Sequence, residues 1–399
     1  MKMKKLARVF TSAALVSAMV ATMGGMTAFA DPVTEIGLTK TVTTDGQTFA
    51  PNTSFTFNLE NGASKTLTGE EYGAAGTQEL TVYEGVDGAL SFNNQFTGDS
   101  RNELLFAPGE GNGEDLPASF DKTGALTVNA EVFHQPGIYH YTVQEEKGDY
   151  EGIVYDTALR HVYLYVNYAV DADGNLTDTL EVGNVVVSKE VNGEEVKVGG
   201  YKINNTELND KGIEFTNNYG DDSGTDPEDP ENPKPEDKND STHDITIGKT
   251  VTGNQGDKNK VFNFVVTVNG GEGEKYKVVD ADGNVLDALE TGVERTYQLS
   301  HGKTIKITGL TENDSYTVVE TEAGQDGYTT TYTLGEGTSV KEGTDHQVVT
   351  ADNATYTVTN DKGVTTPTGI VLSFAPYILL VALAGVFGVL FLRRKKEEF

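Results

Sequence analysis

The sequence has no cysteine and no tryptophan, and it is poor in basic residues: 30 lysines and arginines stand against 61 aspartates and glutamates, for a formal net charge of −31. Without cysteine no disulfide can hold the fold, so stability must come from the core or from another kind of link. The negative charge repels phosphates and argues against nucleic acid as a partner. The 45 glycines and 18 tyrosines favour short strands and turns over helices.

Motifs of enzymes that act on external substrates are also missing. The six histidines make no His-Glu-x-x-His or other metal spacing, and there is no Gly-x-Ser-x-Gly elbow and no phosphate loop. The related stretches "VDADGNL" (170–176) and "VDADGNV" (279–285) lack the glycine position and the twelfth-position glutamate of a calcium loop and predict hairpin turns. We therefore expect no metal site, no cofactor and no turnover of other molecules.

Both ends of the chain carry export signals. Residues 1–30 combine a basic start, an apolar run and the small-x-small pattern Ala28-Phe29-Ala30, which predicts a cleaved signal peptide. Residues 370–392 form an apolar stretch long enough for a transmembrane helix. The basic tail 393–399 follows at once and predicts a cytoplasmic end. The pattern is typical of an exported surface protein that is first held in the membrane.

An acidic, proline-rich segment divides the rest of the chain. Residues 220–243 carry four prolines between acidic side chains, which predicts an extended linker that could hold two domains several nanometres apart. On either side, short alternating segments predict two all-β sandwich domains at 33–219 and 244–362. Residues 61–130 are the least regular part of the first domain, and we expect an insertion there.

An internal repeat relates the two halves. The stretches "GLTKTVT", "YTVQE" and "FTNNY" of the first half correspond to "TIGKTVT", "YTVVE" and "VTNDK" of the second. Strand side chains alternate between two faces, so each half places one lysine, one glutamate and one asparagine in line with apolar neighbours. These six residues are Lys40, Glu145 and Asn217 in the first half and Lys249, Glu320 and Asn360 in the second. Three residue types repeated in the same order indicate a common role.

We interpret each set as the site of an intramolecular isopeptide bond. Burial lowers the pKa of a lysine, and the neutral amine can then attack the carboxamide carbon of the asparagine. The glutamates Glu145 and Glu320 would donate to the amide oxygen and carry protons to the leaving ammonia. Each bond forms once, so the reaction is self-cross-linking and not enzyme turnover. Two purely structural explanations of these residues remain open. They could form a buried ion pair with a hydrogen-bonded amide, or they could lie at strand ends that reach solvent.

The series "TKTV…YTVxE…FTNxY" resembles the isopeptide-containing domains of streptococcal backbone pilins and, more loosely, the collagen-adhesin B-type fold. The resemblance covers about 33–219. The second half resembles related pilin-like domains of Gram-positive surface proteins, although Val358 and Lys362 depart from the pattern. The resemblance of the two halves implies two Ig-like (collagen-adhesin B-type) β-sandwiches joined by the Pro/Asp-rich linker.

The C-terminal pentapeptide is similar to the variant sorting signals of such pilins. Residues 365–369 read Thr365, Thr366, Pro367, Thr368 and Gly369. By that resemblance a class C or housekeeping sortase would cut between Thr368 and Gly369 and pass Thr368 to a pilin lysine or to cell-wall peptidoglycan. The acceptor that we select by position is Lys211, with Lys202 and Lys197 behind it, although a solvated lysine is the plainer interpretation for each.

The resemblance implies a structural cell-surface protein, a pilin subunit of a fimbrium that supports cell adhesion. Its expected partners are a sortase, other pilin subunits, the peptidoglycan and a host surface ligand. The alternative is a monomeric wall-anchored adhesin or stalk protein. Shaft, tip and base positions in a pilus are left open by the sequence.

Overall fold

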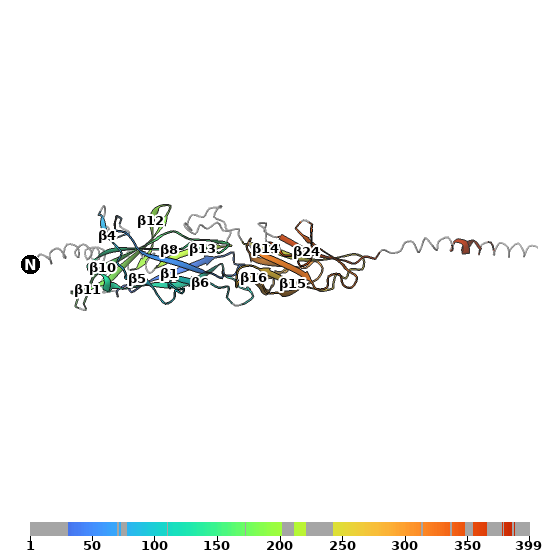
Figure 1. The fold of residues 1–399 in the computed structure, drawn as a ribbon, viewed down its shortest axis with the longest axis horizontal. Coiled ribbons are helices and arrows are strands. Elements are labelled where there is room, and N and C mark those ends of the chain that lie inside the picture. The colour runs from blue at the N-terminus through green and yellow to red at the C-terminus, as the bar shows by residue number, and fades with distance from the viewer. Residues whose placement is uncertain are drawn as a thin grey trace, which may run out of the picture.

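The computed structural model describes two β-domains that lie end to end along the long axis of the molecule (Figure 1). The described residues are 31–69, 72, 78–109, 111–171, 173–201, 211–220, 242–312, 314–335, 337–347 and 354–364, and, in the C-terminal tail, 377, 379–384 and 387. Within these ranges the regular structure of both domains is almost entirely strand, and the expectation of an all-β chain is confirmed.

The first domain consists of two sheets. A five-stranded sheet has the order β5-β7-β1-β13-β9, and a larger sheet has the order β12-β11-β10-β8-β2-β6, with the hairpin β3-β4 attached to β8. The bounds are β1 Glu35–Thr43, β2 Ser54–Asn61, β3 Lys65–Leu67, β4 Leu80–Glu84, β5 Leu90–Phe92, β6 Glu103–Leu105, β7 Ser119–Val128, the 3-10 turn η2 Ala130–Val132, β8 Gly137–Glu145, β9 Ile153–Val154, β10 Arg160–Val170, β11 Leu176–Val191, β12 Glu194–Tyr201 and β13 Ile213–Tyr219.

The second domain repeats this plan with fewer strands. Its sheets have the orders β17-β16-β19-β14-β24-β21-β22 and β18-β15-β20-β23. The bounds are β14 His243–Thr252, β15 Phe262–Asn269, β16 Lys275–Asp280, β17 Val285–Glu290, β18 Arg295–Leu299, β19 Thr304–Leu310, β20 Ser315–Glu320, β21 Thr329–Leu334, β22 Thr338–Val340, β23 His346–Gln347 and β24 Ala354–Asp361.

In each domain the first strand pairs in parallel with the last. Strand β1 lies beside β13, and β14 lies beside β24, although more than a hundred residues separate the partners in both pairs. Alternate side chains of these strands enter the space between the two sheets, as the period of a half-buried strand predicts. The core between the sheets is apolar, with Ile36, Phe57 and Phe215 fully buried in the first domain and Ile247 and Phe264 in the second.

The segment 61–130 is not a simple insertion. Strand β7 from this segment pairs with β1 along its whole length, so it is an integral part of the five-stranded sheet. The hairpin β3-β4 is hydrogen-bonded to β8 through β4, and its Leu67 and Val82 join a small apolar cluster with Tyr163, separate from the main core. Strand β7 could not be recognised in the sequence because its largely exposed first half, "SFDKTG", has a single apolar residue and shows no alternation.

The two domains are in direct contact, so the linker does not hold them several nanometres apart, as its length would allow. The Tyr150 hydroxyl of the first domain donates to Glu274 Oε1 of the second at 2.5 Å, and Thr308 Oγ1 donates to the Gln47 carbonyl oxygen at 2.9 Å. A Cβ added to Gly220 would lie 2.5 Å from Thr242 Oγ1. Gly220 and Thr242, the residues that flank 221–241, therefore lie side by side.

The repeated "VDADGN" stretches form hairpin turns. The carboxylates of Asp171 and Asp280 accept the backbone N–H groups of Asn175 and Asn284, at 2.8 Å in both turns. The side chains that a calcium loop would aim at a cation are thus used to close the turns. The described residues contain no group of three or more potential metal ligands.

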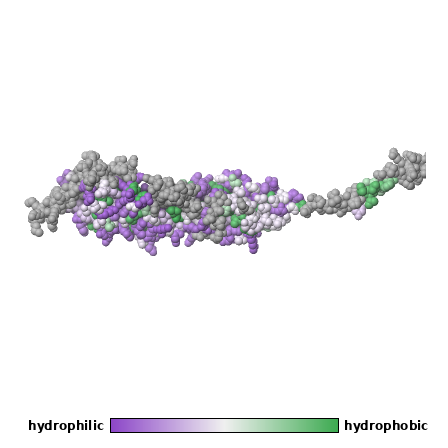
Figure 2. All heavy atoms as spheres, turned by 90° about the horizontal axis from the view of Figure 1, so that it is seen from above, coloured by the Kyte–Doolittle hydropathy of each residue, from purple (hydrophilic) through white to green (hydrophobic). Residues whose placement is uncertain are grey.

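Most of the predicted export signals lie outside the described residues: the signal peptide 1–30, the motif 365–369 and the basic tail 393–399. Of the apolar stretch 370–392, the structure describes a short helical part at 379–384, whose side chains are exposed. Within the described chain, no helix combines the length and the apolarity needed to cross a bilayer. The face of the two domains seen in Figure 2 is largely hydrophilic where it is coloured, with a few scattered apolar spots.

Candidate functional site

The structure brings Lys40, Glu145 and Asn217 together in the core of the first domain. Lys40 lies on β1 and Asn217 on β13, while Glu145 is the last residue of β8 in the opposite sheet. All three are buried, with 0%, 1% and 0% of their surface exposed. Glu145 therefore ends its strand without reaching solvent, which excludes the interpretation that it lies at the rim.

The second domain holds the same arrangement. Lys249 on β14, Asn360 on β24 and Glu320 at the end of β20 are exposed by 1%, 0% and 1%. The register is the same as well: Lys40 is paired with Phe215, two residues before Asn217, and Lys249 is paired with Val358, two residues before Asn360. In both domains the amine and the amide are thus diagonal neighbours on the same face of two parallel strands.

The contacts of the first triad connect the carboxyl group to both nitrogen atoms. Lys40 Nζ lies 2.7 Å from Glu145 Oε2, and Asn217 Nδ2 donates to Glu145 Oε1 at 2.5 Å. The Phe55 ring covers the amine, with its centroid 4.7 Å from Nζ. The backbone N–H of Asp156 donates to Asn217 Oδ1 at 2.8 Å. A backbone N–H is always a donor, so this bond fixes which end of the amide is oxygen.

The second triad has the same two carboxyl contacts. Lys249 Nζ donates to Glu320 Oε2 at 2.7 Å, and Asn360 Nδ2 donates to Glu320 Oε1 at 2.6 Å. The Phe262 ring lies over the amine at 4.2 Å. The amide oxygen differs: Asn360 Oδ1 is buried and accepts no hydrogen bond from the described part of the chain.

Burial shifts the pKa values of Lys40, Glu145 and Lys249 toward their neutral forms. Desolvation lowers the pKa of Lys40 to about 8, although the neighbouring Glu145 carboxylate opposes the shift. Desolvation also raises the pKa of Glu145, and it lowers the pKa of Lys249. In the first triad both shifts reduce the free energy needed to pass a proton from the amine to the carboxyl group, which would leave a neutral amine in an apolar site.

One detail of the predicted mechanism is wrong for the first domain. The sequence interpretation had Glu145 donate to the amide oxygen, but its carboxyl group faces the amide nitrogen. The two carboxyl oxygens contact the amine and the amide nitrogen, which would be the attacking and the leaving nitrogen atoms in an amide exchange. The amide oxygen is held by Asp156 instead.

Sequence reasoning missed Asp156 and Arg160, which flank the first triad. Arg160 is 2% exposed, and one of its terminal nitrogens donates to Asp156 Oδ2 at 2.5 Å. A signal was available: in "RHVYLYV" the arginine shares the inward face of its strand with Val162 and Leu164. The alternation of strand side chains between two faces, which selected Lys40, also selects Arg160 as an inward-facing residue.

The structure describes two of the three predicted acceptor lysines, Lys211 and Lys197. Lys211 is exposed, and its carbonyl oxygen accepts the backbone N–H of Gly200 at the end of β12. Lys197 lies on β12 and is partly buried. Lys202 and the sorting residues 365–369 lie outside the described residues.

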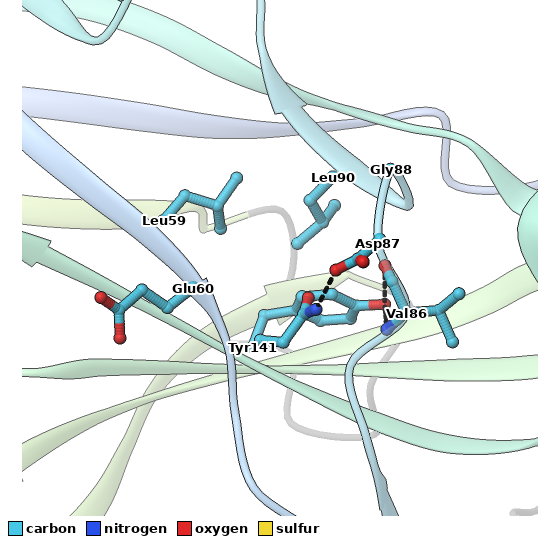
Figure 3. A pocket seen from close by; sticks show the side chains of 8 residues that line it. Leu59, Glu60, Val86, Asp87, Gly88, Leu90 and Tyr141 are labelled. Atoms are coloured by element: carbon cyan, nitrogen blue, oxygen red, sulfur yellow. Dashed lines mark hydrogen bonds between the residues drawn. The ribbon is translucent and has the colours of Figure 1, made fainter.

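A shallow pocket of about 230 Å³ lies between β2 and the turn at 86–90 (Figure 3). Its polar groups bind one another: Asn61 Nδ2 donates to Asp87 Oδ1 at 2.5 Å, and the backbone N–H of Val86 donates to the Tyr141 hydroxyl at 2.8 Å. The volume is below the range of about 300–1,000 Å³ that is usual for small-molecule sites. Apart from the Glu60 carboxylate, the polar side chains that line this pocket are hydrogen-bonded to one another or to the backbone.

Two domain families and two curated relatives match the chain. Residues 36–220 match a family described as Spy0128-like isopeptide containing domain, and residues 243–362 match a domain family of unknown function (DUF7601). A pilin of Streptococcus pyogenes serotype M1 is 28% identical over 361 residues, which cover 87% of this chain and 86% of the relative. The pilus tip adhesin Cpa of Streptococcus pyogenes is 29% identical over 130 residues, only 18% of its own length.

Solved structures of streptococcal major pilins share the fold. The major pilin T3.2 of Streptococcus pyogenes superposes with a TM-score of 0.50 at 22% identity, over 84% of this chain and 100% of that one. A second major pilin structure from Streptococcus pyogenes also gives a TM-score of 0.50, at 21% identity and the same coverage. The first domain thus matches the isopeptide-containing family, and the chain resembles streptococcal pilins in sequence and in fold.

Proposed function

We propose that this chain is a backbone-type pilin subunit that cross-links itself once in each domain, through Lys40–Asn217 and Lys249–Asn360. The observation that carries the proposal is the repetition of a buried lysine, glutamate and asparagine in the same register on the first and last strands of both domains. A buried ion pair stabilises a protein only weakly, so two copies in the same geometry favour a chemical role.

The proposed reaction balances within each triad. The neutral amine of Lys40 attacks the side-chain carbonyl carbon of Asn217, a new carbon–nitrogen bond forms, and the bond to Nδ2 breaks. Nδ2 leaves as ammonia after it takes one proton from Glu145 Oε1, and Oε2 takes one from Nζ. The alignment of the reacting groups in a folded core is worth about 7–11 kcal/mol of the barrier. No cofactor and no second molecule enter the balance.

The cross-links would serve a mechanical purpose. The first and last strands of each domain are parallel neighbours, so tension along the molecule pulls them in opposite directions past each other. A covalent bond between these strands carries the load past the sandwich without unfolding it. Such a bond also gives a chain without cysteine the covalent link that it otherwise lacks.

Polymerisation would use the C-terminal signal. A sortase would cut between Thr368 and Gly369 and pass Thr368 to an acceptor lysine on the next subunit or to peptidoglycan. Lys211 suits the acceptor role because it is exposed on the first domain. The partners of the subunit would be a sortase, further pilin subunits, the cell wall and a host surface ligand, and its place would be a pilus on the cell surface.

A monomeric wall-anchored adhesin or stalk is the second candidate, favoured by the similarity of 130 residues to a pilus tip adhesin. Expression of the chain in its native cell wall distinguishes a backbone pilin from a monomeric stalk. A backbone subunit gives a ladder of high-mass species that survives boiling in detergent and disappears when the pilus sortase gene is deleted. A single wall-released band, unchanged by that deletion, would reject the pilin proposal in favour of the stalk.

A further inference from the structure

The two triads differ at the oxygen of the reacting amide. In the first domain the backbone N–H of Asp156 donates to Asn217 Oδ1 at 2.8 Å, in a site where both residues are buried. Attack on an amide carbon places negative charge on this oxygen, and a fixed donor in a water-free site stabilises that charge strongly. We propose that the Asp156 N–H is the oxyanion donor for the Lys40–Asn217 cross-link, an inference that rests on the cross-linking function proposed above.

Asp156 is held in place by its own side chain. Asp156 Oδ2 accepts a terminal nitrogen of Arg160 at 2.5 Å and the backbone N–H of Thr216 at 3.2 Å. The same nitrogen of Arg160, together with Nε, binds the Glu214 carbonyl oxygen at 2.8 and 3.0 Å. Arg160 thus ties the segment of Asp156 to β13, the strand that carries Asn217. Asp156 supplies the donor, and Arg160 is a positioning residue.

The second domain provides an internal comparison. Its lysine, glutamate and asparagine have the same register and the same carboxyl contacts, but no described group donates to Asn360 Oδ1. A buried carbonyl oxygen without a donor is an unfavourable place for developing charge. The Lys249–Asn360 reaction would therefore proceed without the stabilisation that Asp156 gives to the first site.

The Asp156 N–H acts on Oδ1 while the amide carbon is tetrahedral. When Lys40 Nζ bonds to the amide carbon, the π electron pair of the carbonyl moves to Oδ1, which faces the Asp156 N–H. When the pair returns, the bond to Nδ2 breaks and ammonia leaves with the proton delivered by Glu145. The N–H neither gains nor loses a proton. Its contribution is confined to the charged intermediate, so its removal should slow bond formation and leave the contacts of Lys40 and Glu145 in place.

The test removes this one N–H and no side-chain atom. The full chain is synthesised in a cell-free system with residue 156 replaced by the α-hydroxy analogue of aspartate, which turns the amide into an ester. Samples are quenched over time, digested, and analysed by mass spectrometry for the linked peptides of each domain. Only the fraction that resists limited proteolysis is counted, so that misfolded chains do not enter the rate. The Lys249–Asn360 link in the same molecules serves as an internal clock.

A matched control loses an equivalent hydrogen bond elsewhere. The backbone N–H of Val86 donates to the Tyr141 hydroxyl at 2.8 Å, the same length as the Asp156 bond, and lies outside the triad. We expect the ester at residue 156 to slow the Lys40–Asn217 link by about 10²-fold relative to the clock, and the ester at Val86 to leave that ratio unchanged. Equal ratios in the two esters would overturn the inference.

A measurement on the unaltered chain covers the case in which the ester at residue 156 does not fold. Nuclear magnetic resonance should detect scalar coupling across the hydrogen bond from the Asp156 amide nitrogen to the side-chain carbonyl carbon of residue 217 in the linked protein. Absence of this coupling would overturn the inference and leave the cross-linking proposal intact. Failure of the unaltered chain to form either link would reject both together.

Discussion

Replacement of Glu145 by glutamine tests the proton-carrying role with little change in shape. Glutamine keeps a hydrogen-bonding group beside Lys40 and Asn217 but cannot accept the proton that the amine must lose. We expect Glu145→Gln to fold without the first cross-link, to retain the ammonia that the link would release, and to form the second link normally. Lys40 would then remain as a free amine in an apolar site, 4.7 Å from the Phe55 ring centroid.

The size of the stability loss follows from the loop that the bond closes. Residues 40 and 217 enclose about 180 residues, and the loop-entropy relation for a cross-link of this length gives about 5 kcal/mol. A domain of this size shifts its melting temperature by about 2–4 °C for each kcal/mol, so the loss should be about 10–20 °C. Differential scanning calorimetry and protease resistance at elevated temperature would measure it.

A second variant separates the lost bond from the lost ion pair. Lys40→Met also prevents the link but leaves no buried amine, and it approximately fills the same volume. If the bond is the source of stability, Lys40→Met should lose nearly as much as Glu145→Gln. The reasoning is refuted if Glu145→Gln shows the wild-type mass and melting temperature, or if it lacks the link and still melts with the wild type.

Three further predictions concern the rest of the chain. Glu320→Gln should remove only the second link, which peptide mass mapping would detect, and destabilise the second domain by about 5 kcal/mol. Burial, with repulsion from Glu274, raises the pKa of Asp314 from the usual 3.8 to about 7. The folded chain therefore binds a proton that the unfolded chain has released, and stability should fall as pH rises through this window; denaturant unfolding at several pH values should show the decline, and Asp314→Asn should flatten it. Lys211→Arg keeps the charge but not the acceptor amine, so the detergent-resistant ladder should disappear from cell-wall extracts; an unaltered ladder would move the acceptor elsewhere.

The inward-facing residues of the triads could be predicted from the sequence because the strand period is strict. In "YHYTVQE" (139–145), Tyr139, Tyr141 and Val143 are buried, and Glu145 continues their face to the end of the strand. The same test located Lys249 and Asn360. It works because a one-residue slip would turn the whole apolar set toward solvent.

The pairing of strands and the junction between domains were beyond this reasoning. Strand β7 escaped because its exposed half shows no alternation, yet tertiary pairing with β1 keeps it in the sheet. The acidic, proline-rich segment has the composition of a spacer, but composition does not fix where its two ends lie. The contact of Tyr150 with Glu274 joins residues 124 positions apart, and no local sequence pattern predicts such a contact.

The proposed oxyanion donor could not be predicted from the sequence, for a different reason. A backbone N–H has no residue type, so sequence can place Asp156 near the site only through the side chains that hold it. Arg160, inward-facing among apolar neighbours, was the available clue. A charged residue in line with a buried strand face thus indicates either a reacting group or the support of one.

The intact mass of the purified exported region, residues 31–364, tests the self-cross-linking account as a whole. Two bonds release two molecules of ammonia, and the account predicts a mass lower than the calculated value by that amount, with linked peptides that contain Lys40 with Asn217 and Lys249 with Asn360. A folded protein with the full calculated mass would contradict it.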